Sequence, residues 1–285
     1  MKYLVLGSAG QTGSALVRYL EHRGHKVWGF DIVNSPDEDL RVVDNEALID
    51  QVSRVDFVMF LAFDVGGSRY LREYQHSFDF ISNNAKIMDN TFSVIRRFKT
   101  PFVFASSQMS NMTYSPYGAL KAVGESYTRA LGGLIPRFWN VYGVEHNLQK
   151  SHVITDFIIK ARSTGTIEML TDGMEQRQFL HVDDCSECLT FLSERYDEIP
   201  RNKELHVTTF KWHTILDVAE YVAALYPGTR VVPGELGDDV QKNRRNEPDP
   251  FILNYWQPKT GLEAGIRKVN EQMQNSPGSN DQRKG

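Results

Sequence analysis

Three regularly spaced glycines near the N-terminus constrain this chain more than any other feature of its sequence. They are Gly7, Gly10 and Gly13 in the segment GSAGQTG. The apolar run YLVL precedes them, and from Thr12 onward apolar side chains recur at helical spacing. Small residues between a buried strand and a helix let the backbone approach a pyrophosphate, and the helix N-terminus supplies free N–H groups. A glycine-rich turn without a ligand is the alternative, but the position directly after the first strand favours a nucleotide-binding loop.

Strands and helices alternate through the first half of the chain. Beyond the first strand and helix, we expect strands at 26–33, 56–63, 101–105 and 134–138, with helices at 77–98 and 116–131. This order predicts an α/β chain with a Rossmann-like, doubly wound parallel sheet. The pattern loosens after about residue 143, where helices near 152–162, 183–195, 213–225 and 258–274 are joined by short strands such as 204–208.

The change of pattern divides the chain into two expected regions. A nucleotide-binding domain covers residues 1–143 and is completed by a segment near 177–209. A smaller C-terminal α/β region, 144–274, is expected to bind most of the substrate. The polar tail 275–285 has the composition of a disordered segment.

Composition narrows the class of protein. The 285 residues carry a formal net charge of −4, which argues against nucleic acid as the main partner. The two cysteines are too few for a disulfide scaffold, so a reducing, cytoplasmic location is expected. No apolar run reaches the ~20 residues needed to span a bilayer, and we expect no membrane association.

A carboxylate stands at the end of the second expected strand. Asp31 can accept hydrogen bonds from both hydroxyls of a ribose and would repel a 2′-phosphate, and no arginine directly follows it. This arrangement favours NAD over NADP. An ordinary aspartate at a strand end is the alternative.

Tyr117 and Lys121 form a YxxxK pattern near the start of an expected helix. Their spacing places both side chains on one helical face. A free tyrosine is a poor base near neutral pH, but a neighbouring ammonium and a nicotinamide cation both favour its phenolate. Ser106 and Ser107 end a buried strand just before this helix, at the edge of the sheet where such folds bind ligands. Together these residues indicate proton abstraction coupled to hydride transfer.

Several segments occur in the order and rough spacing of one enzyme family. Besides GSAGQTG and Asp31, they are FASS at 104–107, SPYGALK at 115–121, RFWNVYG at 137–143 and RQFLHVDD at 177–184. Over residues 1–274 the chain resembles the extended short-chain dehydrogenases/reductases, the NAD-dependent nucleotide-sugar epimerases and dehydratases. The resemblance implies bound NAD, a nucleotide-diphosphate sugar, and a homodimer formed through the helices at 77–98 and 116–131. It also implies a catalytic set of Ser107, Tyr117 and Lys121.

Two further stretches resemble particular branches of this family. DLRVVDN at 39–45 with LAFDVGG at 61–67 resembles the GDP-mannose 3,5-epimerases, and SHVI at 151–154 resembles the GDP-fucose synthases. These resemblances imply a GDP-sugar as substrate and His152 as a second acid/base. Contacts to the cofactor are implied for Gly7, Gly10, Gln11, Thr12, Gly13, Asp31, Asp39, Leu40, Leu61, Ala62, Tyr117 and Lys121. Contacts to the substrate are implied for Gly66, Gly67, Ser107, Gln108, Asn140, Arg177 and Arg245, with Arg244 as the alternative to Arg245.

The chain departs from these relatives around the catalytic serine. Gln108 and Met109 stand where the dehydratases have Asp-Glu, which argues against elimination of water. Met109 also replaces the cysteine of the two GDP-sugar branches and has no ionisable proton, which argues against epimerisation at two carbons. Only nine residues separate Ser107 from Tyr117, a short connection that predicts a more open site and brings Asn111 and Tyr114 closer to the sugar.

Other residues receive a structural interpretation. Cys185 and Cys188 form a CxxC without a second pair of ligands, so we expect core packing and no metal. His181 is expected to pack beside the phosphate-binding arginine. The core or a subunit interface is expected for the aromatic positions Phe78, Phe80 and Phe92.

The sequence therefore predicts an NAD-dependent nucleotide-sugar epimerase or dehydrogenase that transfers hydride at sugar C4. Tyr117 removes the proton of the C4 hydroxyl, Ser107 steadies the oxygen, and Lys121 binds the ribose and lowers the pKa of Tyr117. A reductase of 4-keto nucleotide sugars and a non-enzymatic NAD-binding regulatory protein of the same fold are the alternatives.

Overall fold

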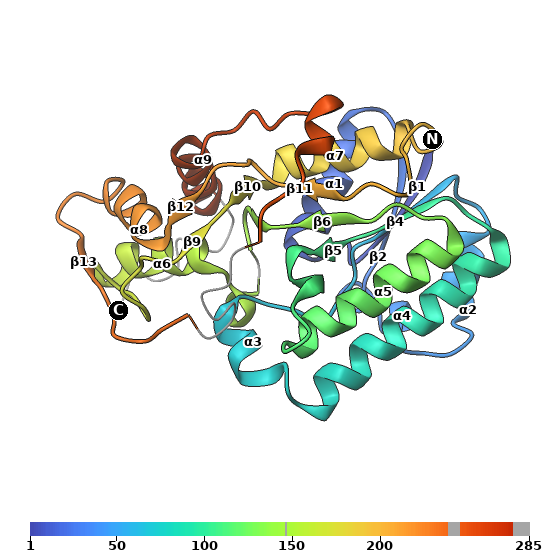
Figure 1. Ribbon diagram of the computed structural model, residues 1–285, viewed down its shortest axis with the longest axis horizontal. Helices are drawn as coiled ribbons and strands as arrows, with labels where there is room; N and C mark the ends of the chain where they lie inside the picture. Colours follow the sequence, from blue (N-terminus) through green and yellow to red (C-terminus); the bar gives the residue numbers. More distant parts are fainter. Residues whose placement is uncertain (146, 239–245, 276–285) are drawn as a thin grey trace.

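A parallel sheet with helices on both faces forms most of the molecule, and short strands and helices form a smaller region at one end (Figure 1). The computed structural model describes residues 1–145, 147–238 and 246–275. The sheet runs in the parallel order β2(Lys26–Phe30), β1(Lys2–Leu6), β3(Phe57–Phe60), β4(Phe102–Phe104). β5(Ser106–Ser107) follows β4 and pairs in parallel with β6(Pro136–Phe138), which pairs with β11(Leu205–Val207). This order confirms the predicted Rossmann-like α/β fold.

The first strand is apolar on both faces because both faces of the sheet are covered. Tyr3 and Val5 pack in a core cluster with side chains of α1(Gln11–His22) and α7(Val182–Glu194). Leu4 and Leu6 point the opposite way, into a second cluster with α2(Glu46–Val52) and α4(Phe78–Phe98). Alternation of side chains along a strand thus divides one apolar run between two cores.

Helix α7 brings both cysteines into the first core. Cys185 and Cys188 are free thiols with no exposed surface, as the core-packing interpretation predicts. On α4, Phe80 and Phe92 are buried, whereas Phe78 is 80% exposed. Of the two expected positions, the core is therefore excluded for Phe78, and a subunit interface stays a prediction.

A third core cluster holds the smaller region together. It joins α6(Val153–Thr164), α8(Ile215–Ala223) and α9(Leu262–Asn275) to the short strands β8(Thr166–Glu168) and β13(Arg230–Val232). Two further pairs of strands are β7(Asn140–Tyr142) with β10(Phe179–His181), which is parallel, and β9(Gln176–Arg177) with β12(His213–Thr214), which is antiparallel. Within the described ranges, no helix is long and apolar enough to cross a membrane.

Element boundaries differ from the expectations where side chains bind the backbone. β2 ends at Phe30 rather than at residue 33, because the carboxylate of Asp31 accepts the N–H of Val33 at 3.0 Å and turns the chain. α9 begins at Leu262 rather than at 258, because Asp184 accepts the N–H groups of Lys259 and Thr260. Two short helices, α2 and α3(Ser68–Tyr74), were not expected.

The glycine loop is held by contacts that exclude a side chain. Gly7 has a φ of +86°, and a Cβ there would lie 2.8 Å from the backbone of Ala62. A Cβ on Gly13 would lie 2.0 Å from the carbonyl oxygen of Gly7. The glycines therefore let α1 begin directly against the end of β1.

Gly13→Ala is expected to lower the free energy of unfolding by about 3 kcal/mol, because the added methyl group must displace the backbone of the loop. Urea denaturation of the purified chain measures this difference. Gly261→Ala is the matched control, since a Cβ there meets nothing within 4 Å, and its effect should stay within about 0.5 kcal/mol. Equal stabilities of the two variants would contradict the close approach of helix and strand.

Candidate active site

A cavity of about 680 Å³ gathers residues from distant parts of the sequence. Its volume lies within the usual range for small-molecule sites. Every site residue that the sequence predicts and the structure describes lines this cavity. These are Gly7, Gly10, Gln11, Thr12, Gly13, Asp31, Asp39, Leu40, Leu61, Ala62, Gly66, Gly67, Ser107, Gln108, Tyr117, Lys121, Asn140, His152 and Arg177. Arg245 and its alternative Arg244 lie outside the described residues.

The glycine loop and Asp31 form one end of the cavity. The N–H of Gly7 donates to the carbonyl of Phe30 at 2.8 Å, which ties the loop to the end of β2. The carboxylate of Asp31 accepts the N–H of Ala9 at 3.0 Å, so the acidic group is fixed beside the loop. Gly10 precedes α1 as its capping residue, and no side chain makes a capping hydrogen bond to the start of this helix. The loop, the uncapped helix start and the fixed carboxylate fit the pyrophosphate and ribose of NAD.

Helix α5(Pro116–Leu131) carries Tyr117 and Lys121 to the cavity. Ser115 caps the helix by accepting the N–H of Gly118, and Pro116 occupies its first turn. Lys121 is buried and its Nζ donates to the carbonyl oxygen of Ala105 at 2.7 Å. This bond fixes the ammonium at the end of the strand that leads to Ser107.

The ring of Phe63, which follows β3, contacts both Tyr117 and Lys121. The ring of Phe63 lies 3.7 Å from Nζ of Lys121, measured to the ring centroid. The same ring meets Tyr117 edge to face at 5.8 Å between centroids. Phe63 was not among the residues that the sequence singled out, since a phenylalanine after a buried strand is also typical of a core position.

Without NAD, the pKa of Tyr117 is not lowered by Lys121, contrary to the expectation from the sequence. Burial raises the pKa of Tyr117 to about 12, although a hydrogen bond with Ser107 lowers it. Burial also lowers the pKa of Lys121 to about 7, opposed by the negative charge of Glu125. The expected lowering of the tyrosine pKa by Lys121 is therefore not found, and the residues of the chain hold Tyr117 as a phenol.

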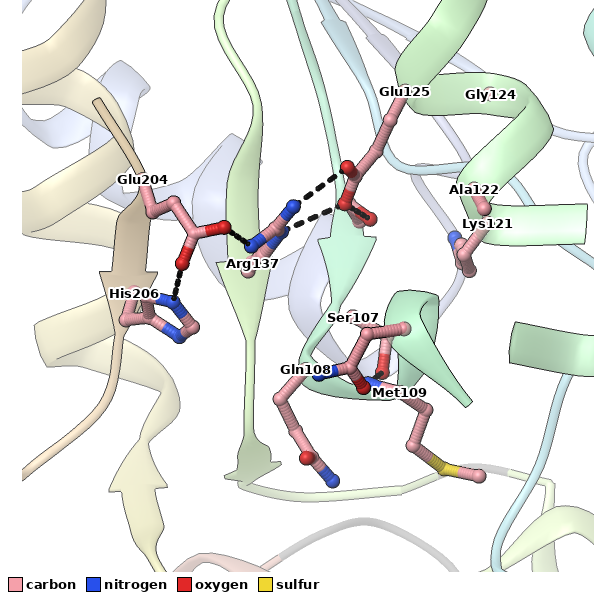
Figure 2. Close-up of polar contacts among 12 residues, drawn as sticks. Ser107, Gln108, Met109, Lys121, Ala122, Gly124, Glu125, Arg137, Glu204 and His206 are labelled. Carbon is pink, nitrogen blue, oxygen red and sulfur yellow. Dashed lines mark hydrogen bonds and ion pairs between the residues drawn. The ribbon is translucent and has the colours of Figure 1, made fainter. Parts of the chain in front are cut away.

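Behind the cavity, a buried ion pair ties α5 to the sheet (Figure 2). Glu125 accepts two hydrogen bonds from Arg137 of β6, both at 2.8 Å. It also accepts the hydroxyl of Ser106 at 2.7 Å. Arg137 reaches on to Glu204, which accepts a hydrogen bond from His206 at 3.0 Å. The network connects α5 with β5, β6 and β11.

The short connection between Ser107 and Tyr117 folds into a single turn, η2(Gln108–Asn111). Ser107 caps this turn by accepting the N–H of Met109 at 3.1 Å. Helix α5 rests directly on it, since a Cβ on Gly118 would lie 2.4 Å from the carbonyl oxygen of Met109. Neither Asn111 nor Tyr114 lines the cavity, so shortening the connection does not bring them to the site.

The C-terminal part of the chain returns to this turn. The side-chain N–H of Asn246 donates to the side-chain oxygen of Gln108 at 2.5 Å and to its carbonyl oxygen at 2.6 Å. Asn246 was not predicted, because an asparagine among polar residues carries no local signal. Its neighbour Arg245 was singled out by the resemblance alone.

The cavity is also lined by charged side chains outside the glycine loop and α5. Arg177 donates to Asp238 at 2.5 Å, and Lys150 donates to Asp64 at 2.7 Å. The hydroxyl of Tyr70 also donates to Asp64, and these bonds outweigh the burial that raises the pKa of this carboxyl, so the pKa lies below its usual value. His181 is fully buried and caps α7 outside the cavity. Among the described residues, no group of three or more metal-binding side chains comes together.

Comparison with known proteins agrees with this geometry. A model of the NAD dependent epimerase/dehydratase family matches residues 3–208, and the chain belongs to this family. The family confirms NAD as the predicted cofactor. GDP-L-fucose synthase of Escherichia coli (strain K12) is 25% identical, over 93% of this chain and 94% of that protein. GDP-L-fucose synthase 1 of Arabidopsis thaliana is 26% identical, over 94% and 91%.

Solved structures share the fold. UDP-glucose 4-epimerase of Thermotoga maritima, solved with UDP-glucose, superposes with a TM-score of 0.78 at 20% identity, over 96% of this chain and 99% of that one. UDP-glucose 4-epimerase of Thermus thermophilus, solved with NAD, has a TM-score of 0.75 at 22% identity, over 97% and 100%. These similarities support the Rossmann-like fold independently of the motifs.

The Glu125–Arg137 pair predicts a specific pH dependence. Burial raises the pKa of Glu125, but the bonds from Arg137 and Ser106 outweigh it and bring the pKa to about 2 from 4.5. A carboxyl with a lowered pKa stabilises the fold above the unfolded-state value and loses this contribution as the pH falls through the folded-state value. Glu125→Gln should lower the free energy of unfolding at pH 7 by about 3 kcal/mol, because the guanidinium of Arg137 loses its buried partner and keeps only the half-exposed Glu204.

Urea denaturation between about pH 5 and pH 2 measures this effect. Over that range the variant should lose about 3 kcal/mol less stability than the original chain. Glu198→Gln is the control, since Glu198 forms an exposed ion pair with Arg195, and it should behave like the original chain. A parallel acid profile for Glu125→Gln would show that the buried pair does not stabilise the fold.

Proposed function

We propose that this chain is an NAD-dependent nucleotide-sugar epimerase or dehydrogenase that transfers hydride at C4 of the sugar. The observation that supports this most is the meeting of Ser107, Tyr117 and Lys121 with the glycine loop and Asp31 in one cavity. A proton acceptor and a hydride acceptor must act on the same carbon, so both have to reach one substrate position.

NAD, Tyr117, Ser107 and Lys121 each have a separate task in the proposed hydride transfer. NAD, when bound, supplies the hydride acceptor and a positive charge near the reacting carbon. Tyr117 takes the proton of the C4 hydroxyl, and Ser107, which lines the same cavity, steadies the same oxygen. Since burial holds Tyr117 as a phenol in the chain alone, its action as a base depends on positive charge beside it. NAD would bring this charge when bound, and Lys121 binds the ribose.

The substrate lies toward the C-terminal region in this proposal. Asn140 and Arg177 bind the diphosphate, and Gly66, Gly67 and Gln108 contact the sugar. A guanidinium suits this role because its donors are forked and permanently charged. The similarity to GDP-L-fucose synthases supports a GDP-sugar. We assign residues 1–143 with 177–209 to the cofactor and 144–274 mainly to the substrate.

Reduction of a 4-keto nucleotide sugar is the second candidate, since it uses the same residues in the reverse direction. A reductase needs an exchangeable cofactor, whereas an epimerase keeps and recycles the one it holds. Assay of the NAD and NADH content of the purified protein therefore separates the two. Retained cofactor supports an epimerase.

A homodimer in the cytoplasm completes the proposal. Exposed apolar side chains gather on α4 and α5, where Phe78 is 80% and Val123 47% exposed. Burial of such side chains between two copies stabilises a dimer. Both cysteines are free thiols, which suits a reducing compartment.

Tyr117→Phe should lower turnover by about 100-fold or more, because it removes the proton acceptor while keeping the ring. Turnover is measured as hydride transfer with a panel of GDP-, UDP- and dTDP-sugars, after thermal shift has identified those that bind. NAD binding should be unchanged. Tyr127→Phe is the control on the same helix, where the hydroxyl binds Asp89 at the surface; turnover of Tyr117→Phe equal to this control would exclude the proposal.

Asp31→Ala should reduce the preference for NAD over NADP by at least about tenfold, because it removes the charge that repels a 2′-phosphate. Fluorescence titration of both cofactors gives the ratio of dissociation constants. Asp37→Ala, an exposed carboxylate nearby in the chain, should leave the ratio unchanged. An unaltered ratio in Asp31→Ala would show that another residue selects the cofactor.

A further inference from the structure

A glutamate that the sequence did not single out holds His152 at the cavity. Nδ1 of His152 lies 2.6 Å from one carboxylate oxygen of Glu145, and the backbone N–H of His152 donates to the other oxygen at 2.9 Å. The side chain of Glu145 is 7% exposed and that of His152 is 43% exposed. Both residues line the cavity that contains Tyr117.

The carboxylate of Glu145 is held as an acceptor. Its burial raises the pKa, but hydrogen bonds from His152 and Thr155 outweigh the burial and leave the pKa below its usual value. An ionised carboxylate only accepts hydrogen bonds, so Nδ1 of His152 carries the proton of this contact. In the neutral imidazole, Nε2 is then the nitrogen with the lone pair.

The imidazole ring of His152 does not cap the helix that follows it. His152 is the residue before α6, but its side chain makes no capping hydrogen bond to this helix. Glu145 accepts the backbone N–H there instead. One carboxylate therefore anchors both the backbone and the ring of the same histidine, which restricts the ring to one orientation.

We propose that Glu145 is a positioning residue that fixes the Nδ1–H form of His152 and presents Nε2 to the substrate as an acid/base. The inference rests on the proposed function, which supplies a ketone at C4. A C–H bond next to that ketone is acidic. Nε2 takes this proton, the electron pair of the C–H bond moves into the enolate, and the imidazolium returns a proton to the same carbon.

The first test requires no substrate. Nitrogen-15 NMR of the full chain with labelled histidine reports which ring nitrogen carries the proton, and His152→Gln assigns the signal. The original chain should show the Nδ1–H form at His152. Glu145→Ala removes the acceptor and should change this distribution. An unchanged His152 signal in Glu145→Ala would overturn the proposal, and thermal unfolding verifies that the variant is folded.

The second test follows proton exchange. The 4-keto-6-deoxy derivative of GDP-mannose is supplied in D₂O, and mass spectrometry follows deuterium at the carbons next to the ketone. Exchange at saturating ligand should fall by about 100-fold in Glu145→Ala with KM little changed, and less in Glu145→Gln, which keeps a neutral acceptor. Glu194→Gln, which alters a carboxylate paired with His25 outside the cavity, should exchange like the original chain.

The outcomes separate this inference from the proposed function. Hydride transfer that depends on Tyr117, together with exchange that is unaffected by Glu145→Ala, rejects the role of Glu145 and leaves the proposed function intact. Absence of exchange in the original chain, with hydride transfer present, rejects the role of His152 as an acid/base. Absence of hydride transfer with every sugar rejects the proposed function, while the NMR result still decides whether Glu145 sets the form of His152.

Discussion

The candidate site depends on how one helix is fixed to the sheet, and a buried ion pair fixes it. Tyr117, Lys121 and Glu125 follow one another at intervals of four residues along α5 and therefore share a face. Glu125 binds Arg137 and Ser106, so this face is held against the strands that end at Ser107. A shift of the helix would separate a buried carboxylate from its guanidinium, which costs several kcal/mol. The distance between Ser107 and Tyr117 is thus maintained by charges that do not line the cavity.

Local patterns predicted much of this arrangement. The glycines, Asp31 and the pair Tyr117 and Lys121 each depend on residues close in sequence, since a strand, a turn and a helix are enough to place them. Parallel strands then bring their carboxyl ends to one edge, so the assembly of these residues in one cavity follows from the fold. The parallel, doubly wound arrangement of the sheet was predicted from the alternation of strands and helices.

Contacts made by loops or by distant segments were not predictable in this way. Glu145 meets His152 because a loop after β7 returns to the start of α6, and Asn246 reaches Gln108 across almost half of the chain. The direction of the Tyr117 pKa also depends on burial, which only the packed structure determines. The start of α9 at Leu262 was missed because a distant carboxylate, Asp184, binds the backbone of Lys259 and Thr260.

The turn η2 has a consequence for how this protein can acquire new specificity. Where a long connection follows the catalytic serine, its residues can vary without disturbing the strand or the helix, since surface loops tolerate change. Here η2 is packed under α5, and the backbone at Gly118 leaves no room between them. Variation in this segment would therefore alter the position of α5 itself. Evolution or engineering of substrate choice is less constrained at Glu145, Asn147 and Lys150, which line the cavity from outside this segment.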